Sequence, residues 1–451
     1  METAFVADPT RLIVSAILGI IILLVLIMRF KMQPVLAIIL SAIAIGAGAG
    51  MSGNMIIATI NKGMSRTLEG IALLIGLGSM FGAILEISGG AQRIATTLVN
   101  KFGESKAAWA LGITGVVIAT PVFFDAGLII LIPLAFSVAK RTGKSTLFYV
   151  IPLLAGLAVG HTFIPPTPGP VLVANILGVD LGLVIVVGVC IGFVAMVLAG
   201  PVFGHYCGTR FFVPVPKSIA DMPDYDESKM PAFWTVVVII LIPLFLIVLN
   251  TVSGVVGFME PARPFLGFIG TPFIALTIST LVAMYVLGVK HGYSLKELEK
   301  VMTASLGPTG MIMLVTAGGG VLRYMLQDSG LGEIIGETVA ATPLPLVLVA
   351  FLVAGLVRIS VGSATVAMTM AAGIMAAMPE VADLSQLQLA AMVAAIAGGA
   401  TICSHVNDSG FWLVKSLVEI DEKTTLKTWT VMETIVGCTG AVGALVLSLV
   451  A

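Results

Sequence analysis

Long runs of apolar residues dominate this sequence. Runs such as residues 11–29, 33–50 and 181–204 can each cross about 30 Å of hydrocarbon as a helix that rises about 1.5 Å per residue. Of the 451 residues, 58% are hydrophobic and only 10% are charged, too few charges for a soluble domain of this length. The runs are continuous rather than alternating, which argues against a β-barrel. The sequence therefore predicts an all-α polytopic membrane protein embedded in the lipid bilayer.

Composition and motifs exclude several other classes of protein. The formal net charge is −1, so we expect no nucleic-acid partner. The four cysteines are scattered without the spacing of a metal site or a disulfide framework, and we interpret them as packing residues. No Walker motif, dinucleotide fingerprint or metal-binding cluster appears in the sequence. We therefore expect no cofactor, no metal and no enzymatic activity.

The apolar runs fall into two kinds, complete and interrupted. Four runs are broken near their middle by polar residues, Pro and Gly, so that the pieces beside each break are about half a span long. Short amphipathic helices are expected at residues 52–66, 89–104 and 290–301. Complete spans are predicted at residues 11–29, 33–50, 70–88, 181–204, 231–250, 265–288, 308–326 and 428–450. The interrupted runs are residues 107–139, 147–177, 344–378 and 387–418.

The distribution of basic residues predicts the topology. We interpret 107–139 and 344–378 as re-entrant hairpins, and 147–177 and 387–418 as crossing helices that are unwound at the centre. With this arrangement most of the 23 Lys and Arg fall in segments on one side of the membrane. The positive-inside rule then places the N-terminus and the C-terminus both outside.

The two halves of the chain also resemble each other. The segment GLGSMFGAILEISGGAQRI in the first half is similar to TAGGGVLRYMLQDSGLGEI in the second. The sequence therefore predicts an inverted repeat, each half with a re-entrant hairpin and a broken transmembrane helix, as in many secondary transporters. Residues 1–204 form the first half with extra N-terminal helices, 205–230 a cytoplasmic linker, and 231–451 the second half.

The four breaks predict a binding site. Unwound backbone at membrane depth is tolerated only where it lines an enclosed, usually wet cavity. A helix begins after each break, and its free N–H groups and partial positive charge favour an anion. Nearby hydroxyl and amide groups suit a solute that also carries hydroxyls. We expect the breaks to lie close together and the site to be lined by Asp125, Gly127, His161, Thr167, Pro168, Gly169, Arg358, Ser360, Gly362, Ser363, Thr365, His405, Asn407, Asp408, Ser409 and Gly410.

The ionisable residues in the breaks each have two interpretations. A guanidinium such as that of Arg358 costs about 3 kcal/mol inside an apolar run unless it is paired, either with a substrate carboxylate or with Asp408. Asp125 and Asp408 are candidates for carrying a coupling proton, and equally for capping helices. His161 and His405 flank the two unwound centres and serve either as proton relays or as hydrogen-bonded struts.

At these breaks the sequence resembles the gluconate permease family, part of the ion-transporter superfamily of secondary carriers. The motifs PVFFDAG, FIPPTPGP, RISVGSATVA and SHVNDSGFW carry the resemblance, in the family's order and spacing. The resemblance implies proton-coupled symport of gluconate or a similar small hydroxylated carboxylate across the bacterial inner membrane. It further implies a homodimer whose transport domain moves against a scaffold in alternating access of the elevator type. Where gluconate carriers often have a His, this chain has Thr167, a departure that bears on the preferred substrate.

The same residues also fit other functions. A sodium-coupled carrier of small carboxylates could use carbonyl and hydroxyl oxygens at the breaks as sodium ligands. A D-serine-type permease would use the same architecture for a different hydroxylated acid. A passive anion channel rarely needs paired inverted hairpins. An intramembrane enzyme is least expected, because no nucleophile–base pair or zinc ligand set appears.

Overall fold

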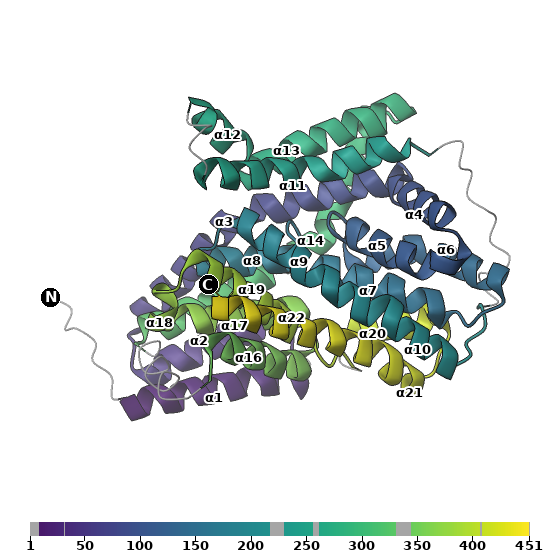
Figure 1. Ribbon diagram of the computed structural model, residues 1–451. Helices are drawn as coiled ribbons and strands as arrows, with labels where there is room; N and C mark the ends of the chain where they lie inside the picture. The colour runs from purple at the N-terminus through teal and green to yellow at the C-terminus, as the bar shows by residue number, and fades with distance from the viewer. Residues whose placement is uncertain are drawn as a thin grey trace.

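The computed structural model describes residues 9–30, 32–216, 230–255, 261–330, 344–405 and 408–450. Within these ranges the regular secondary structure is helical throughout (Figure 1). Five of the helical stretches described are long and apolar enough to cross a membrane, or six if the bent helix α3 counts as one span. The prediction of an all-α, multi-pass membrane protein is confirmed.

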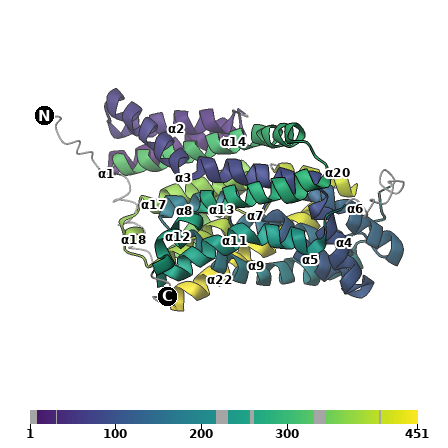
Figure 2. The same cartoon turned by 90° about the horizontal axis from the view of Figure 1, so that it is seen from above.

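Two long helices lie against each other. Helix α3 (Gly53–Ile87) joins the predicted amphipathic helix 52–66 to the span 70–88, with a bend of 42° between them. Helix α14 (Leu295–Asp328) likewise joins the end of 290–301 to the span 308–326. The expectation of separate short helices was wrong here, because α3 continues through Gly70, and α14 through Gly307 and Pro308, without ending. Figure 2 shows α3 and α14 beside α1 (Pro9–Met28) and α2 (Pro34–Ala49).

The next helices contain the first two breaks. Helices α5 (Ala107–Ala119) and α6 (Phe124–Thr142) form a hairpin with its break at residues 120–123. Helices α7 (Leu147–Phe163) and α8 (Pro168–Leu177) form a helix broken at 164–167. Before and after them come α4 (Gly90–Phe102), α9 (Leu181–Val197), a π-helical turn η2 (Leu198–Val202) and α10 (Phe203–Arg210). The predicted linker 205–230 begins within α10, and its residues 217–229 lie outside the described ranges.

The same order of elements recurs after α14. Helices α16 (Leu346–Val361) and α17 (Ala364–Ala376) meet at the break 362–363, and α19 (Gln386–Gly399) and α20 (Ser409–Val418) are separated by 400–408. The predicted span 265–288 is divided at 270–271, because Pro272 starts a new helix. The remaining elements described are η1 (Glu104–Lys106), α11 (Phe233–Val255), α12 (Arg263–Ile269), α13 (Pro272–Ala283), η5 (Met284–Gly288), η6 (Val289–His291), α18 (Pro379–Ala382), α21 (Glu422–Thr425), η7 (Leu426–Thr430) and α22 (Val431–Val450).

Glycines allow the broken helices to pack closely in the core. A Cβ on Gly156 of α7 would lie 2.1 Å from the carbonyl oxygen of Gly112 in α5. A Cβ on Gly399 of α19 would lie 2.2 Å from the carbonyl oxygen of Phe351 in α16. Only small residues permit such backbone approach between membrane helices. Helices α7 and α19 are therefore buried along almost their whole length, and they carry the breaks into the middle of the molecule.

Candidate functional site

Contacts between the two series of helices bring the breaks together. Gly169, in the first turn of α8, lies so close to α17 that an added Cβ would be 2.5 Å from Sδ of Met368. The hydroxyls of Thr162 and Thr401, beside the two unwound centres, are 3.2 Å apart. These contacts join segments from opposite ends of the chain, as the expected clustering of the breaks requires.

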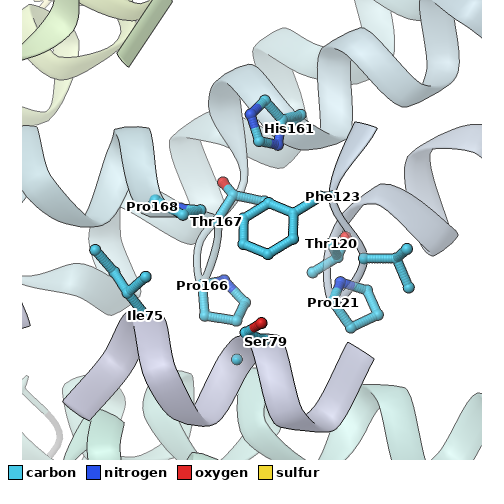
Figure 3. A pocket seen from close by; sticks show the side chains of 11 residues that line it. Ile75, Ser79, Thr120, Pro121, Phe123, His161, Pro166, Thr167 and Pro168 are labelled. Atoms are coloured by element: carbon cyan, nitrogen blue, oxygen red, sulfur yellow. The ribbon is translucent and has the colours of Figure 1, made fainter. Parts of the chain in front are cut away.

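A small cavity lies between α3 and the first two breaks (Figure 3). Its volume is about 20 Å³, which is room for a single water molecule. Figure 3 shows the Phe123 ring between His161 and Ser79. The lining residues are Ile75, Gly78, Ser79, Thr120, Pro121, Val122, Phe123, His161, Pro166, Thr167 and Pro168.

Two helices begin at this cavity without a side-chain cap. Among the described residues, no side chain accepts a hydrogen bond from the first turn of α6 or of α8. Thr167 stands at the N-cap of α8, but its hydroxyl donates backwards to the Ile164 carbonyl over 2.8 Å. Pro168 and Pro170 have no N–H, so Gly169 offers the single donor at the start of α8. These uncapped ends carry the partial positive charge that attracts anions.

The helices that follow the other two breaks are capped by their own residues. Ser363 accepts from the N–H of Val366 over 3.4 Å at the start of α17. Asp408 accepts from the N–H of Gly410 over 3.0 Å at the start of α20. The anion-attracting helix ends therefore belong to the first half of the chain, a distinction that sequence analysis did not make.

His161 contributes a polar atom to the cavity region. Its Nδ1 is buried and has no hydrogen-bond partner among the described residues. Its ring stands edge-on to Phe123, with the ring centroids 6.5 Å apart. By contrast, Nδ1 of His405 lies 2.9 Å from the Cys403 carbonyl, a local contact that fits a strut. Of the two histidines, His161 is the one with a buried nitrogen left for a ligand or water.

Arg358 is buried at the end of α16 and joins two breaks. Its guanidinium bonds to the carboxylate of Asp408 and to the carbonyl of Gly362. Asp408 accepts a further hydrogen bond from the Ser404 hydroxyl. Of the two partners that the sequence allowed for Arg358, the structure contains Asp408. The pair fixes the tip of the second hairpin to the N-terminus of α20.

The last helix supplies residues that sequence analysis missed. Trp429 donates from Nε1 to the Ser404 hydroxyl over 2.7 Å, and the Cys403 N–H donates to the Thr434 hydroxyl over 3.1 Å. Glu433 of α22 lies in sequence between Trp429 of η7 and Thr434, close enough to Arg358 and Asp408 for their charges to act on it. The sequence predicts 428–450 only as a complete span. A lone carboxylate inside an apolar run was the signal that should have singled out Glu433.

The other predicted site residues are distributed around this centre. Asp125 lies in the first turn of α6, is exposed, and is close enough to Asp408 for their charges to interact. Gly127 is buried against Leu157, Thr365 is half-buried in the first turn of α17, and Ser409 is exposed. Ser360 belongs to the last turn of α16, and Asn407 lies outside the described residues. No metal-binding group of three or more His, Cys, Asp or Glu occurs in the part of the chain described.

Two solved transporters share this fold. The YdaH transporter of Alcanivorax borkumensis aligns with a TM-score of 0.58 and 16% identity over 86% of each chain. MtrF of Neisseria gonorrhoeae, described as illuminating a class of antimetabolite efflux pumps, aligns with a TM-score of 0.62 and 15% identity over 87% of this chain and 84% of that one. At such identities the likeness concerns the fold alone.

Proteins related in sequence share much higher identity with this chain. The chain is 38% identical over 432 residues to the low-affinity gluconate transporter of Escherichia coli (strain K12), covering 96% of this chain and 97% of the relative. It is 36% identical to the Gnt-II system L-idonate transporter of the same organism, over 96% and 98%. It is 37% identical to a gluconate permease of Pseudomonas aeruginosa, over 97% and 98%. A family model described as GntP family permease matches residues 11–450. The expectation of a transporter rather than an enzyme is therefore confirmed, and this protein belongs to the GntP family of permeases.

Proposed function

We propose that this permease takes up gluconate or a closely related small hydroxy acid together with a proton. The observation that carries the proposal is the pair of uncapped helix ends, of α6 and α8, at one cavity. They suit a carboxylate, and the hydroxyls of Ser79, Thr120 and Thr167 around them suit the hydroxyls of a sugar acid. Relatives of near full length named for gluconate and L-idonate support this substrate class.

The size of the cavity supports alternating access. Ligand pockets usually measure about 300–1,000 Å³, whereas this cavity has about 20 Å³. A hydroxy acid therefore binds only after the breaks separate from α3. In the elevator arrangement we propose, the hairpins and broken helices move as one transport domain against α3 and α14. The hydrogen bond from Ser79 of α3 to the Ser305 carbonyl of α14, 2.8 Å long, belongs to the static scaffold.

The order of elements supports the inverted repeat. A long helix, a hairpin, a broken helix and a span occur as α3, α5–α6, α7–α8 and α9, and again as α14, α16–α17, α19–α20 and α22. We propose residues 1–204 and 231–451 as the two halves, with 205–230 as the cytoplasmic linker and both termini outside. By family resemblance we assign the protein to the bacterial inner membrane as a homodimer.

Proton coupling needs a group that exchanges protons with the solution. Of the two carboxylates that the sequence singles out, Asp408 is held by Arg358 and by the start of α20. Asp125 is exposed at the start of α6. We therefore assign proton exchange to Asp125, and to Asp408 the fixed counter-charge of Arg358.

Transport by purified protein in liposomes tests the function. In sodium-free buffer, a proton gradient directed into the liposomes should drive accumulation of gluconate or L-idonate against its concentration gradient. Accumulation that requires sodium would indicate the sodium-coupled carrier instead. Equilibration without accumulation would indicate a channel, and uptake of D-serine alone would indicate the D-serine-type permease.

A pair of variants tests the location of the site. Thr167→Asn provides a side chain that can cap the Gly169 N–H, the donor left at the start of α8. Losing one charge-assisted hydrogen bond to the substrate should weaken gluconate binding by roughly 10-fold or more. Thr167→Ser keeps the hydroxyl and is the matched control, with affinity close to that of the wild type. Equal binding by both variants, measured by calorimetry in detergent, would remove the start of α8 from the site.

A further inference from the structure

Glu433 is a buried carboxyl group inside the last apolar helix. It belongs to α22, is 5% exposed, and follows Trp429 by about one helical turn. The segment formed by η7 and α22 packs on the break between α19 and α20. Trp429 of η7 donates a hydrogen bond to the Ser404 hydroxyl, and the Cys403 N–H donates to the Thr434 hydroxyl of α22. Glu433 therefore faces the unwound segment and not the lipid.

The charges around Glu433 do not balance. Arg358 and Asp408 both act on it, and Asp408 also interacts with Asp125. This cluster has one cation and three carboxyl groups, and the contact between Arg358 and Asp408 neutralises one of them. An unpaired charge is costly in a buried, apolar environment, so a buried carboxyl without its own cation takes up a proton instead. Of the two that remain, Asp125 is exposed and Glu433 is buried.

We propose that Glu433 holds the coupling proton while the substrate crosses the membrane. The inference rests on the symport proposed above. An ionised Glu433 adds a buried negative charge that repels the substrate carboxylate, and protonation removes this contribution. A proton taken from solution by the exposed Asp125 passes to the buried Glu433 carboxylate, the anion then binds, and both leave on the other side. One proton and one monovalent anion thus cross together without net charge, and Glu433 returns ionised.

The neighbours of α22 offer no better cation for Glu433. Helix α22 packs against α7, α9, α16, α19, η2 and η7. Titratable groups on these elements and in the adjoining break are Tyr149, His161, Cys190, Arg358, Cys403, His405, Asp408 and Lys427. Among the described residues, Arg358 and Asp408 are those whose charges act on Glu433. Two nitrogens of the Arg358 guanidinium bond to Asp408 and Gly362, and its Nε has no hydrogen-bond partner in the part of the chain described. Because no ion pair of Glu433 with Arg358 forms there, Glu433 is left to titrate.

Binding measured against pH tests this role. Gluconate affinity of the purified wild type should fall by roughly 10-fold from about pH 5 to 9, as expected for one unit charge near an anion at intermediate dielectric. Glu433→Gln fixes the neutral state, so its affinity should remain at the acidic value throughout. In liposomes the same variant should exchange internal for external gluconate but fail to accumulate it. Glu299→Gln, an exposed carboxyl at the start of α14, is the control and should behave as the wild type.

The outcomes separate this inference from the function on which it rests. If the wild type moves no protons with gluconate, the symport proposal fails. If the wild type is proton-coupled and Glu433→Gln keeps both its pH dependence and its accumulation, the proton is held elsewhere and the inference is overturned. Should Glu433→Gln not fold, Glu433→Asp keeps a titratable group at a different distance from Arg358. A shifted pH midpoint of binding then supports the role of Glu433, and an unchanged midpoint contradicts it.

Discussion

Replacing Arg358 by Met should destabilise the protein by about 3–5 kcal/mol. The Arg358 side chain is 4% exposed and the Asp408 side chain 13% exposed, so water can solvate little of either charge when the pair is broken. Met fills a similar volume but leaves the Asp408 carboxylate without a cation and the Gly362 carbonyl without this donor. The expected loss is therefore that of an uncompensated buried charge, which exceeds the net contribution of the intact pair.

A double-mutant cycle checks this reasoning. In Asp408→Asn the side-chain oxygen can still accept from the Gly410 N–H and cap α20. Because no charge is then left unpaired, Arg358→Met combined with Asp408→Asn should be about 2 kcal/mol more stable than Arg358→Met alone. Equilibrium unfolding in mixed micelles measures each variant. Lys62→Met breaks the more exposed pair with Asp328 and, as control, should cost about 0.5 kcal/mol. The argument would be refuted if the changes in unfolding free energy of Arg358→Met and Asp408→Asn sum to that of the double variant within about 0.5 kcal/mol.

Three further variants follow from the packing and the charges. Gly156→Ala places a Cβ 2.1 Å from the Gly112 carbonyl oxygen, so α5 and α7 must move apart and the free energy of unfolding should fall by about 2 kcal/mol. The control Gly53→Ala has open space around it and should leave thermal unfolding unchanged. Asp125→Asn should abolish accumulation of substrate but allow exchange, and normal accumulation at every pH would assign proton exchange to another group. Arg358→Lys keeps the charge but cannot reproduce the forked contact with Asp408 and Gly362, so gluconate binding should weaken by roughly 10-fold, as titration calorimetry would measure.

The positions of the breaks could be predicted because local chemistry determines them. Pro, Gly and polar residues interrupt apolar runs at 120–123, 164–167 and 362–363, and the helices end there in the structure. An unpaired backbone group in lipid is so costly that such an interruption has few other solutions. The division at 270–271 follows the same rule, since Pro272 starts α13, but one Pro in the first third of a long apolar run is a weak signal by itself.

Other features depend on tertiary contacts that no local pattern encodes. Whether Arg358 pairs with substrate or with Asp408 depends on how the tip of α16 meets α20. Glu433 looked like one polar residue in an ordinary span, and its importance comes from the break that packs against it. The continuous helices α3 and α14 contact each other where the predicted pieces of α14 meet, because Ser79 donates to the Ser305 carbonyl over 2.8 Å and accepts from the Thr309 hydroxyl over 2.9 Å.

The unequal capping of the helices gives the site a polarity. In the first half the starts of α6 and α8 are open, while in the second half Ser363 and Asp408 occupy the corresponding positions. An acid bound between the halves would therefore keep its carboxylate toward α6 and α8 throughout the cycle, with its hydroxylated tail toward α17 and α20. The hydroxyls nearest the carboxylate would then meet Ser79, Thr120 and Thr167, and the far end of the acid would meet the second half, so that relatives could change the length of the acid they carry without altering how its head group is held.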